Sequence, residues 1–418
     1  MRFRSESRSS LSRPPAAVPG PPAARLSRPL VALLATACGL AVATVYFAQP
    51  VLDAVAASFG ITESRIGVVI AVTQAGYAVG LLTLVPLGDL VDRRRLVAVQ
   101  LALAAVALVV VGTAQSATIL LVGLAAVGVL AVVAQVLVAF AVSLAGPGES
   151  AAVVGMVTSG IVVGIVAART FAGLVTQLAG WRAVYLTSAT LTLVLCGLLL
   201  RALPQTPPSA PGIRYRELLR SMAWLYRTER ALRVRALLAM LIFAALNVLW
   251  TPLALQLSAP PLALSHGAIG LLGLAGVAGA LAAVQAGRLA DRGHAEVTTG
   301  VALAILLLAW LPIGLVEHSV AALVVGLLLL DLAVQAVHVT SQSIIYRIDP
   351  TARSRLVGVY MVFYSIGSAA GSLAASAIYA STGWSGVCLL GAGISATAIL
   401  LWAGTLNWRD GERGQWSA

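Results

Sequence analysis

A single carboxylate stands near the middle of a long apolar run, residues 319–345, and polar side chains follow it at regular intervals. Gln335, His338 and Gln342 lie four, seven and eleven residues after Asp331, so all four share one face of a helix. A charge at the centre of a membrane helix costs about 2.5–3.5 kcal/mol, so such a group faces a cavity or a partner, or is protonated. We expect Asp331 to carry a proton, assisted by His338.

One arginine, Arg169, also lies inside an apolar run. It could neutralise Asp331 across the molecule, bind an anionic group of a substrate, or line a wet cleft, and the sequence leaves these alternatives open. In the first case Asp331 would pair permanently with Arg169 or a histidine and would only fix helix packing. A buried carboxyl group favours its neutral form, whereas a neighbouring cation favours the ionised form. The partner of Asp331 therefore decides whether it can exchange a proton.

The other reactive side chains form no catalytic or metal-binding set. The four histidines lie in separate segments, and the sequence contains no HExxH or Walker motif. Cys38, Cys196 and Cys388 all lie in apolar runs without metal-ligand spacing, as expected of buried thiols. We therefore expect no enzyme activity, no metal and no cofactor.

The composition indicates which elements position these groups. Hydrophobic residues make up 60% of the 418 residues and charged residues only 10%, against about 25% charged residues in soluble domains. The net charge of +12 comes from arginines beside apolar runs, where membrane topology explains them better than nucleic-acid binding does. The composition therefore predicts a protein embedded in a lipid bilayer.

Twelve apolar runs are long enough to cross a bilayer, which takes about 20 residues per helix. We expect one six-helix bundle in residues 29–203 and a second in 236–406. The linker between them, 204–235, includes an amphipathic helix on the inner membrane surface. Residues 1–28 and 407–418 are expected to be cytoplasmic tails, the first one disordered. The predicted fold is all-α, with spans at 29–52, 66–88, 96–114, 117–144, 151–178, 182–203, 236–257, 267–289, 297–316, 319–345, 356–380 and 384–406.

Arginine placement tests this count independently. With the N-terminus inside, 24 of the 27 arginines fall in inner segments, as the positive-inside rule requires. Only Arg65 and Arg182 fall on the outer side, and Arg169 lies within a span. All the basic residues are arginine, which together with the heavy use of alanine indicates a GC-rich bacterial genome. We expect a bacterial inner-membrane protein with both termini in the cytoplasm.

A polar turn occurs twice, after the second and the eighth apolar runs. A glycine, an aspartate and an arginine recur in it at a constant separation of 199 residues, which indicates an internal duplication. The residues concerned are Gly88, Asp89, Asp92 and Arg93 in the first copy and Gly287, Asp291 and Arg292 in the second.

These two copies resemble the loop motif of the major facilitator superfamily, Gly-x-Leu-Ala-Asp-Arg-x-Gly-Arg-Arg/Lys, although Arg95 replaces the later glycine. The resemblance covers about residues 29–406 and implies two pseudo-symmetric six-helix bundles that transport by alternating access. In that family the aspartate, here Asp92, meets the positive end of span eleven and holds the halves together on the cytoplasmic side. The alternative is that Asp92 and residues 93–95 only anchor a helix end.

The same resemblance places spans one, four, seven and ten around a central cavity. The helix face that carries Asp331, Gln335, His338 and Gln342, here called the Asp331 stripe, would then face the transport path. Span four lacks the intramembrane arginine of many proton-driven drug antiporters. Asp53, at the outer end of span one, is expected to be a solvated helix end. The candidate cavity residues are Tyr46, Gln49, Gln74, Gln135, Asn247, Trp250 and Gln335.

Residues 159–173 in span five partly resemble the exporter motif Gly-x-x-x-Gly-Pro-x-x-Gly-Gly. Gly160 and Gly164 fit the first spacing, but Ile165 stands where the proline would be. Small residues at this spacing also serve ordinary helix packing. The run Tyr46-Phe-Ala-Gln-Pro50 in span one, together with Ala-Arg-Thr170 in span five, resembles bacterial proton-coupled exporters of drugs and arabinose.

The sequence thus predicts a monomeric transporter that exports a small organic molecule, drug-like or a metabolite, by proton antiport. One alternative is a sugar or metabolite transporter that works as a symporter or uniporter. Another is a membrane sensor or scaffold that binds a ligand without moving it.

Overall fold

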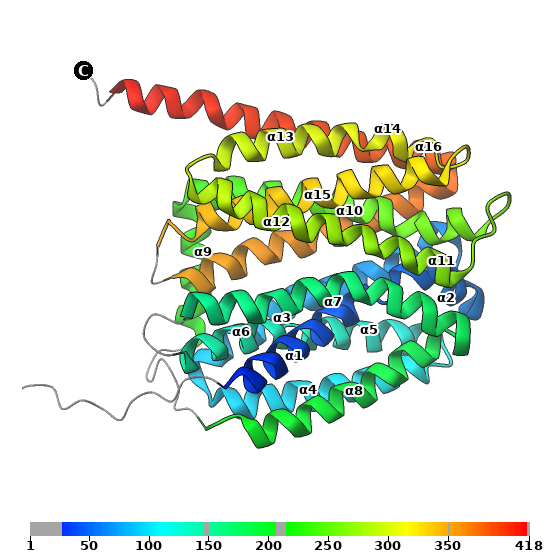
Figure 1. Cartoon of the computed structure of the whole chain (residues 1–418), viewed down its shortest axis with the longest axis horizontal. Coiled ribbons are helices and arrows are strands. Elements are labelled where there is room, and N and C mark those ends of the chain that lie inside the picture. Colours follow the sequence, from blue (N-terminus) through cyan, green and yellow to red (C-terminus); the bar gives the residue numbers. More distant parts are fainter. Residues whose placement is uncertain (1–26, 146–149, 206–214, 350–351, 416–418) are drawn as a thin grey trace, which may run out of the picture.

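The computed structural model describes residues 27–145, 150–205, 215–349 and 352–415 and contains no strand in these ranges. The apolar runs form helices because a helix pairs its backbone groups internally, as a bilayer demands. Figure 1 shows the arrangement. The elements are α1 (Arg28–Tyr46), η1 (Gln49–Val51), α2 (Leu52–Phe59), η2 (Glu63–Arg65), α3 (Gly67–Leu90), α4 (Arg93–Gly112), α5 (Ala117–Ala131), α6 (Val133–Leu144), α7 (Ser150–Ala179), α8 (Trp181–Ala202), α9 (Tyr215–Thr228), α10 (Arg230–Ser258), α11 (His266–Leu271), η3 (Leu272–Ala275), α12 (Gly276–Asp291), α13 (Ala295–Leu308), α14 (Trp310–Ile313), α15 (Val320–Ile345) and α16 (Arg353–Gln415).

Eleven helical stretches of the described chain are long and apolar enough to cross a membrane. The last of them, Arg355–Thr405, has 51 residues, more than two spans require. Gly383 interrupts it with a φ of 67°, a conformation that glycine adopts without a steric penalty. Helix α16 therefore supplies two spans, and the expectation of an all-α protein with twelve membrane helices is confirmed.

The two halves form separate layers in Figure 1, with α1–α8 in the lower layer and α10–α16 in the upper one. Helix α1 packs on α7 and α3 on α5 in the first half, and α10 packs on α16 and α12 on α15 in the second. Gly88 faces Val136 in the first half as Gly287 faces Val339 in the second. The halves therefore repeat one packing pattern.

The bundle has two distinct ends. Both copies of the polar turn, together with α9, lie at one end, which we call the motif end (Figure 1). Helices α2 and α11 lie at the opposite end, which we call the far end.

Three helix boundaries differ from those expected. The first span continues through η1 and α2 to Phe59. Its middle part is the 3₁₀ turn η1, which contains Pro50, a residue without the N–H group that a regular α-helix uses. Helix α10 begins at Arg230 instead of residue 236, and α16 continues to Gln415, past residue 406. The expected tail 1–28 lies almost entirely outside the described residues, as does the segment 206–214 of the linker.

The glycines that resemble an exporter motif serve close packing. Gly160 and Gly164 of α7 face Ala35 and Gly39 of α1, and a Cβ atom on either α7 glycine would meet the α1 backbone. Small residues thus let these two helices approach closely, and this contact fixes α7, which carries Arg169.

Candidate functional site

A narrow cavity lies between the two halves. Helices α1 and α7 line it from the first half, and α10, α12 and α15 line it from the second. The cavity volume is only about 20 Å³, which leaves room for about one or two water molecules. The polar side chains in its wall are Tyr46, Arg169, Asp331 and Gln335, and the remaining lining is apolar.

The Asp331 carboxyl group is buried and accepts no hydrogen bond from a described residue. The residue is 6% exposed, and its Oδ2 atom accepts no hydrogen bond from the described residues. Asp331 also forms no ion pair with a described residue; Glu296, for comparison, pairs with Arg235. The permanent pairing with Arg169 considered from the sequence is therefore not observed. A buried, unsatisfied acceptor costs about 1–3 kcal/mol, so this oxygen is available to a proton or a ligand.

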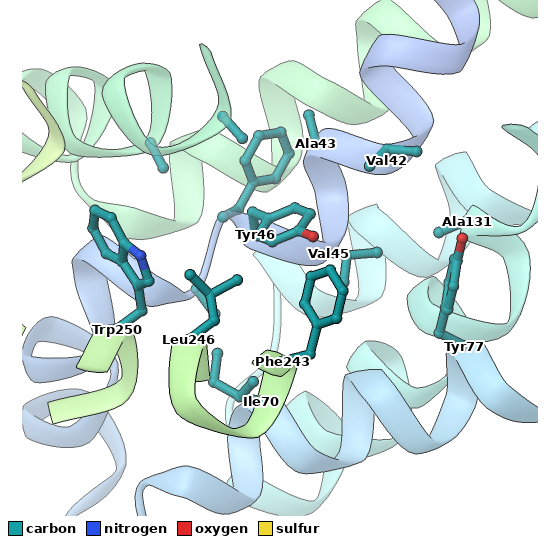
Figure 2. Close-up of a cluster of buried hydrophobic side chains, with 14 of the residues drawn as sticks. Val42, Ala43, Val45, Tyr46, Ile70, Tyr77, Ala131, Phe243, Leu246 and Trp250 are labelled. Carbon is teal, nitrogen blue, oxygen red and sulfur yellow. The ribbon is translucent and has the colours of Figure 1, made fainter. Parts of the chain in front are cut away.

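Aromatic rings and an amide hold Arg169 instead of a carboxylate. Its Nε donates a hydrogen bond of 2.8 Å to Oε1 of Gln49. Its Cζ atom lies 3.7 Å from the centre of the Trp250 ring and 5.4 Å from that of Tyr46. Such cation–π contacts stabilise a desolvated guanidinium, and Arg169 is only 1% exposed. Figure 2 shows Trp250 and Tyr46 with the neighbouring Leu246.

The bond from Arg169 continues across the interface between the halves. Gln49 Nε2 donates to Asn247 Oδ1 at 3.2 Å, and Asn247 Nδ2 donates to the carbonyl of Phe243 at 2.9 Å. Gln49 reaches both partners because it lies in η1, where α1 has just ended. The predicted residues Gln49, Asn247 and Trp250 thus come together around Arg169.

A second contact between the halves joins two tyrosines. The hydroxyl oxygens of Tyr46 and Tyr364 are 2.7 Å apart, and the Tyr364 ring lies edge-on to Phe243, with the ring centres 4.1 Å apart. Tyr364 was not among the residues expected from the sequence. Its spacing of four from Tyr360 in an apolar run was the available signal, because it places both hydroxyls on one helix face.

His338 lies on the same helix as Asp331 but is not part of the cavity lining. Its Nδ1 lies 2.9 Å from the Tyr360 hydroxyl and its Nε2 lies 3.2 Å from the Gln342 amide nitrogen. The amide donates to Nε2, so Nδ1–H donates to Tyr360. Hydrogen bonds occupy both ring nitrogens in this arrangement.

Gln135 and Gln74 lie beside the central cavity, next to Tyr77 and Tyr364 respectively. Gln135 lines a second cavity, at the motif end, with Arg93, Met222 and Arg355, and its amide nitrogen is 3.5 Å from the Tyr77 hydroxyl. Gln74 is buried, and its Oε1 accepts no hydrogen bond from a described residue.

The first copy of the polar turn is tied to its own half by hydrogen bonds. Asp92 caps α4 by accepting a 2.9 Å bond from the Arg94 backbone N–H, as N-cap aspartates do. Arg93 donates to the carbonyls of Gly88 at 2.9 Å and Ala139 at 3.3 Å, and Arg94 donates to that of Leu200. The Asp89 side chain lies outside the described residues.

The second copy is more open. Gly287 lies within α12, Asp291 ends it, and Arg292 follows as its C-cap; both Asp291 and Arg292 are exposed. Here Arg347, from the end of α15, donates a 3.1 Å bond to the Ala290 carbonyl.

One expectation for the far end is wrong. Asp53 is not a solvated helix end, because its carboxylate lies 3.1 Å from His266 Nε2. The two residues are 213 positions apart in the sequence and belong to different halves, so no local pattern links them.

Comparison with known proteins identifies the class. The family model described as Major Facilitator Superfamily matches residues 32–259 and 235–415. The uncharacterised transporter YgaY of Escherichia coli (strain K12) is 47% identical over 377 residues, which cover 90% of this chain and 95% of that protein. The transporter SCO4007 of Streptomyces coelicolor is 34% identical over 388 residues, covering 93% and 88%. This chain belongs to the major facilitator superfamily, and it is a transporter rather than an enzyme.

Solved structures show the same fold. A bacterial homologue of the human lysosomal transporter Spinster, in an inward-facing and unoccupied conformation, superposes with a TM-score of 0.74 at 14% identity, covering 90% of this chain and 97% of that one. A D-xylose–proton symporter gives a TM-score of 0.70, also at 14% identity, with the same coverage of both chains. The protein is therefore a multi-pass membrane transporter with the superfamily fold.

Proposed function

We propose that this transporter exports a small organic molecule in exchange for protons, and that Asp331 carries the proton. The observation that supports this proposal is the unpartnered carboxyl oxygen of Asp331 in a cavity that both halves line. A carboxyl group between two moving halves can be exposed to each side of the membrane in turn. It can then take up a proton from one side and release it to the other.

Substrate and proton would compete for this carboxyl group. A positively charged substrate group favours the ionised form of a carboxyl, and protonation removes that attraction. Arg169 is the neighbouring fixed charge, and the two side chains line the same cavity without an ion pair between them. In this proposal His338 keeps α15 in register through Tyr360, and Asp331 alone exchanges the proton.

The proposed orientation has both ends of the chain in the cytoplasm of a bacterium and the protein in the inner membrane as a monomer. The arginine-rich segments support it, because basic residues favour the cytoplasmic side. The halves 29–203 and 236–406, joined by residues 204–235, would rock about the cavity. Asp92 would gate the motif end in addition to capping α4.

The test uses inside-out vesicles with an acidic interior and a pH-sensitive dye. Compounds are added to vesicles that contain wild-type protein, Asp331→Asn, or the exposed-site control Glu63→Gln. We expect substrate-dependent proton release with wild type and Glu63→Gln, and none with Asp331→Asn. Equal release by Asp331→Asn would remove this carboxyl group from the coupling path.

A second candidate function is sugar or metabolite symport. The amide side chains of Gln49 and Asn247, close to the cavity, offer the donors and acceptors that hydroxyl groups require. Symport is distinguished by the sign of coupling, since substrate and protons then move in the same direction. Substrate uptake that acidifies the receiving compartment would establish symport over antiport.

A further inference from the structure

The central cavity holds two opposite charges that attract each other through space but form no ion pair. Arg169 extends from α7 in the first half, and Asp331 extends from α15 in the second. Among the described residues Arg169 donates one side-chain hydrogen bond, to a neutral amide, and Asp331 keeps one oxygen unsatisfied. Burying a charge is costly unless an opposite charge or hydrogen bonds compensate it. Each of these groups is therefore suited to a ligand group of the opposite sign.

The position of Arg169 is fixed before any ligand arrives. Gln49 engages Nε, and the Trp250 ring covers one face of the guanidinium. The terminal nitrogens of an arginine form a planar fork that matches a carboxylate with two parallel hydrogen bonds. Arg169 thus offers a preorganised anion site. A ligand that binds there loses little binding free energy to ordering this side chain.

Apart from Tyr46 and Gln335, the rest of the cavity wall is apolar. It includes Ile165 and Val166 of α7, Phe243 and Leu246 of α10, and Ala280 of α12. Such a wall excludes water, which strengthens both electrostatic contacts. The cavity in this structure has room for only about one or two water molecules, so a ligand with an aliphatic or aromatic substituent enters when the halves move apart. The cavity therefore presents an anion site, a cation site and an apolar surface to a single small molecule.

We propose that the substrate is a small zwitterion, with a carboxylate that binds Arg169, an ammonium that binds Asp331, and an apolar substituent against α7 and α10. This inference rests on the proposed transport function and names the substrate class of the same cavity. A singly charged ligand makes a direct contact with only one of these two side chains, and the other keeps only the through-space attraction between them. A zwitterion satisfies both and adds no net charge to the buried site.

The inference also specifies the competition with protons. The substrate ammonium and a proton both require the ionised Asp331 oxygens, so binding one excludes the other. An anionic analogue behaves differently, because it binds Arg169 best when Asp331 is protonated, and would therefore travel together with a proton. The charge of the ligand thus decides the sign of coupling.

The first experiment measures binding to the purified full-length protein by isothermal titration calorimetry. The probes are leucine (zwitterion), leucine methyl ester (cation), N-acetyl-leucine (anion) and N-acetyl-leucine methyl ester (neutral), with the matching phenylalanine series. We expect each amino acid to bind about 10- to 100-fold more tightly than its singly charged relatives, as expected for the loss of one charged hydrogen-bond contact. A methyl ester that binds as tightly as its parent, or no binding in either series, would overturn the inference.

Variants assign each charge to its ligand group. Arg169→Gln should remove the preference for leucine over its methyl ester, and Asp331→Asn should remove the preference over N-acetyl-leucine. Arg182→Gln, which removes an arginine outside the cavity, and Glu63→Gln should leave the ranking unchanged. If Arg169→Gln does not fold, Arg169→Lys retains the charge without the fork, and should weaken leucine binding while preserving the ranking. An unchanged leucine affinity in Arg169→Lys would contradict the role given to the fork.

Proton release in the vesicle assay separates this inference from the proposed antiport. Zwitterion binding without proton release keeps the substrate class and removes antiport. Proton release by the methyl esters alone keeps antiport and removes the zwitterion.

Discussion

The two ends of the interface between the halves are built differently. At the far end the halves meet through backbone atoms: Gly173 of α7 lies against Gly270 of α11, and Gly67 of α3 lies against Ser372 of α16. At the motif end they are separated by the second cavity, lined by side chains that include Arg93, Met222 and Arg355. The cavity volume is about 40 Å³ at the motif end and about 20 Å³ in the central cavity.

The far-end contacts leave no room for larger residues. A Cβ atom on Gly173 would meet the backbone of His266 and Gly270, and one on Gly67 would meet the carbonyl of Ser372. Backbone atoms cannot move aside as flexible side chains do, so these contacts depend on glycine. The far end is closed in this structure.

Side chains and α9 hold the motif end. Tyr215 donates hydrogen bonds to the carbonyls of Leu82 at 3.0 Å and Thr83 at 3.2 Å in α3. Tyr226 stacks on Phe363 of α16, with the ring centres 5.0 Å apart. Helix α9 thus touches both halves through contacts that can be exchanged. The two halves therefore meet through fixed backbone atoms at the far end and through side chains, which can change partners, at the motif end.

The strongest test of this comparison is Gly173→Leu. Overpacking a close contact costs about 1–3 kcal/mol, which shifts a two-state equilibrium by about 5- to 150-fold. We expect the far end to open. Spin labels on Ser64→Cys and Glu317→Cys, with the native cysteines replaced, would report a longer distance in pulsed electron paramagnetic resonance.

The matched control is Gly197→Leu, because a Cβ atom on Gly197 meets nothing within 4 Å. It should leave the far-end distance unchanged. An unaltered distance in Gly173→Leu would show that the glycine contact does not hold the far end closed.

A smaller effect is expected at the motif end from Tyr215→Phe. The substitution removes the hydroxyl that bonds to α3, at a cost of about 0.5–1.5 kcal/mol. Labels on Arg95→Cys and His294→Cys should then show a broader distance distribution at the motif end, while the far-end distance stays constant. Broadening at both ends would mean that the two ends do not differ in the way proposed.

The smallest effect is expected from Asp53→Asn at the far end. The carboxylate and His266 are partly exposed, and such pairs contribute about 0.2–1 kcal/mol. The far end should open slightly, and the difference between wild type and variant should shrink in high salt, because salt screens exposed charges. A salt-independent difference would identify a packing effect instead of an ionic one.

The fold follows from the sequence because each span is a local property of about 20 residues. The Asp331 stripe was also visible, since helical spacing places Asp331 and Gln335 on one face. The partners of Arg169 were not, because Gln49 lies 120 residues away and comes from another helix. Only the assembled bundle shows that rings and an amide, rather than Asp331, hold the guanidinium.

The place of Gln135 also depends on contacts between helices. Its amide nitrogen lies 3.5 Å from the Tyr77 hydroxyl, 58 residues away on another helix, and it lines the cavity at the motif end. No local pattern records such a contact, so the sequence could not show which cavity this side chain lines.

The glycine contact at the far end has a consequence for the size of the cargo. Because Gly173 and Gly270 already touch through backbone atoms, the two halves cannot approach each other any further at the far end. We therefore expect rocking of the two halves to widen the motif end only until these backbones meet, which would limit the width of any molecule that enters there.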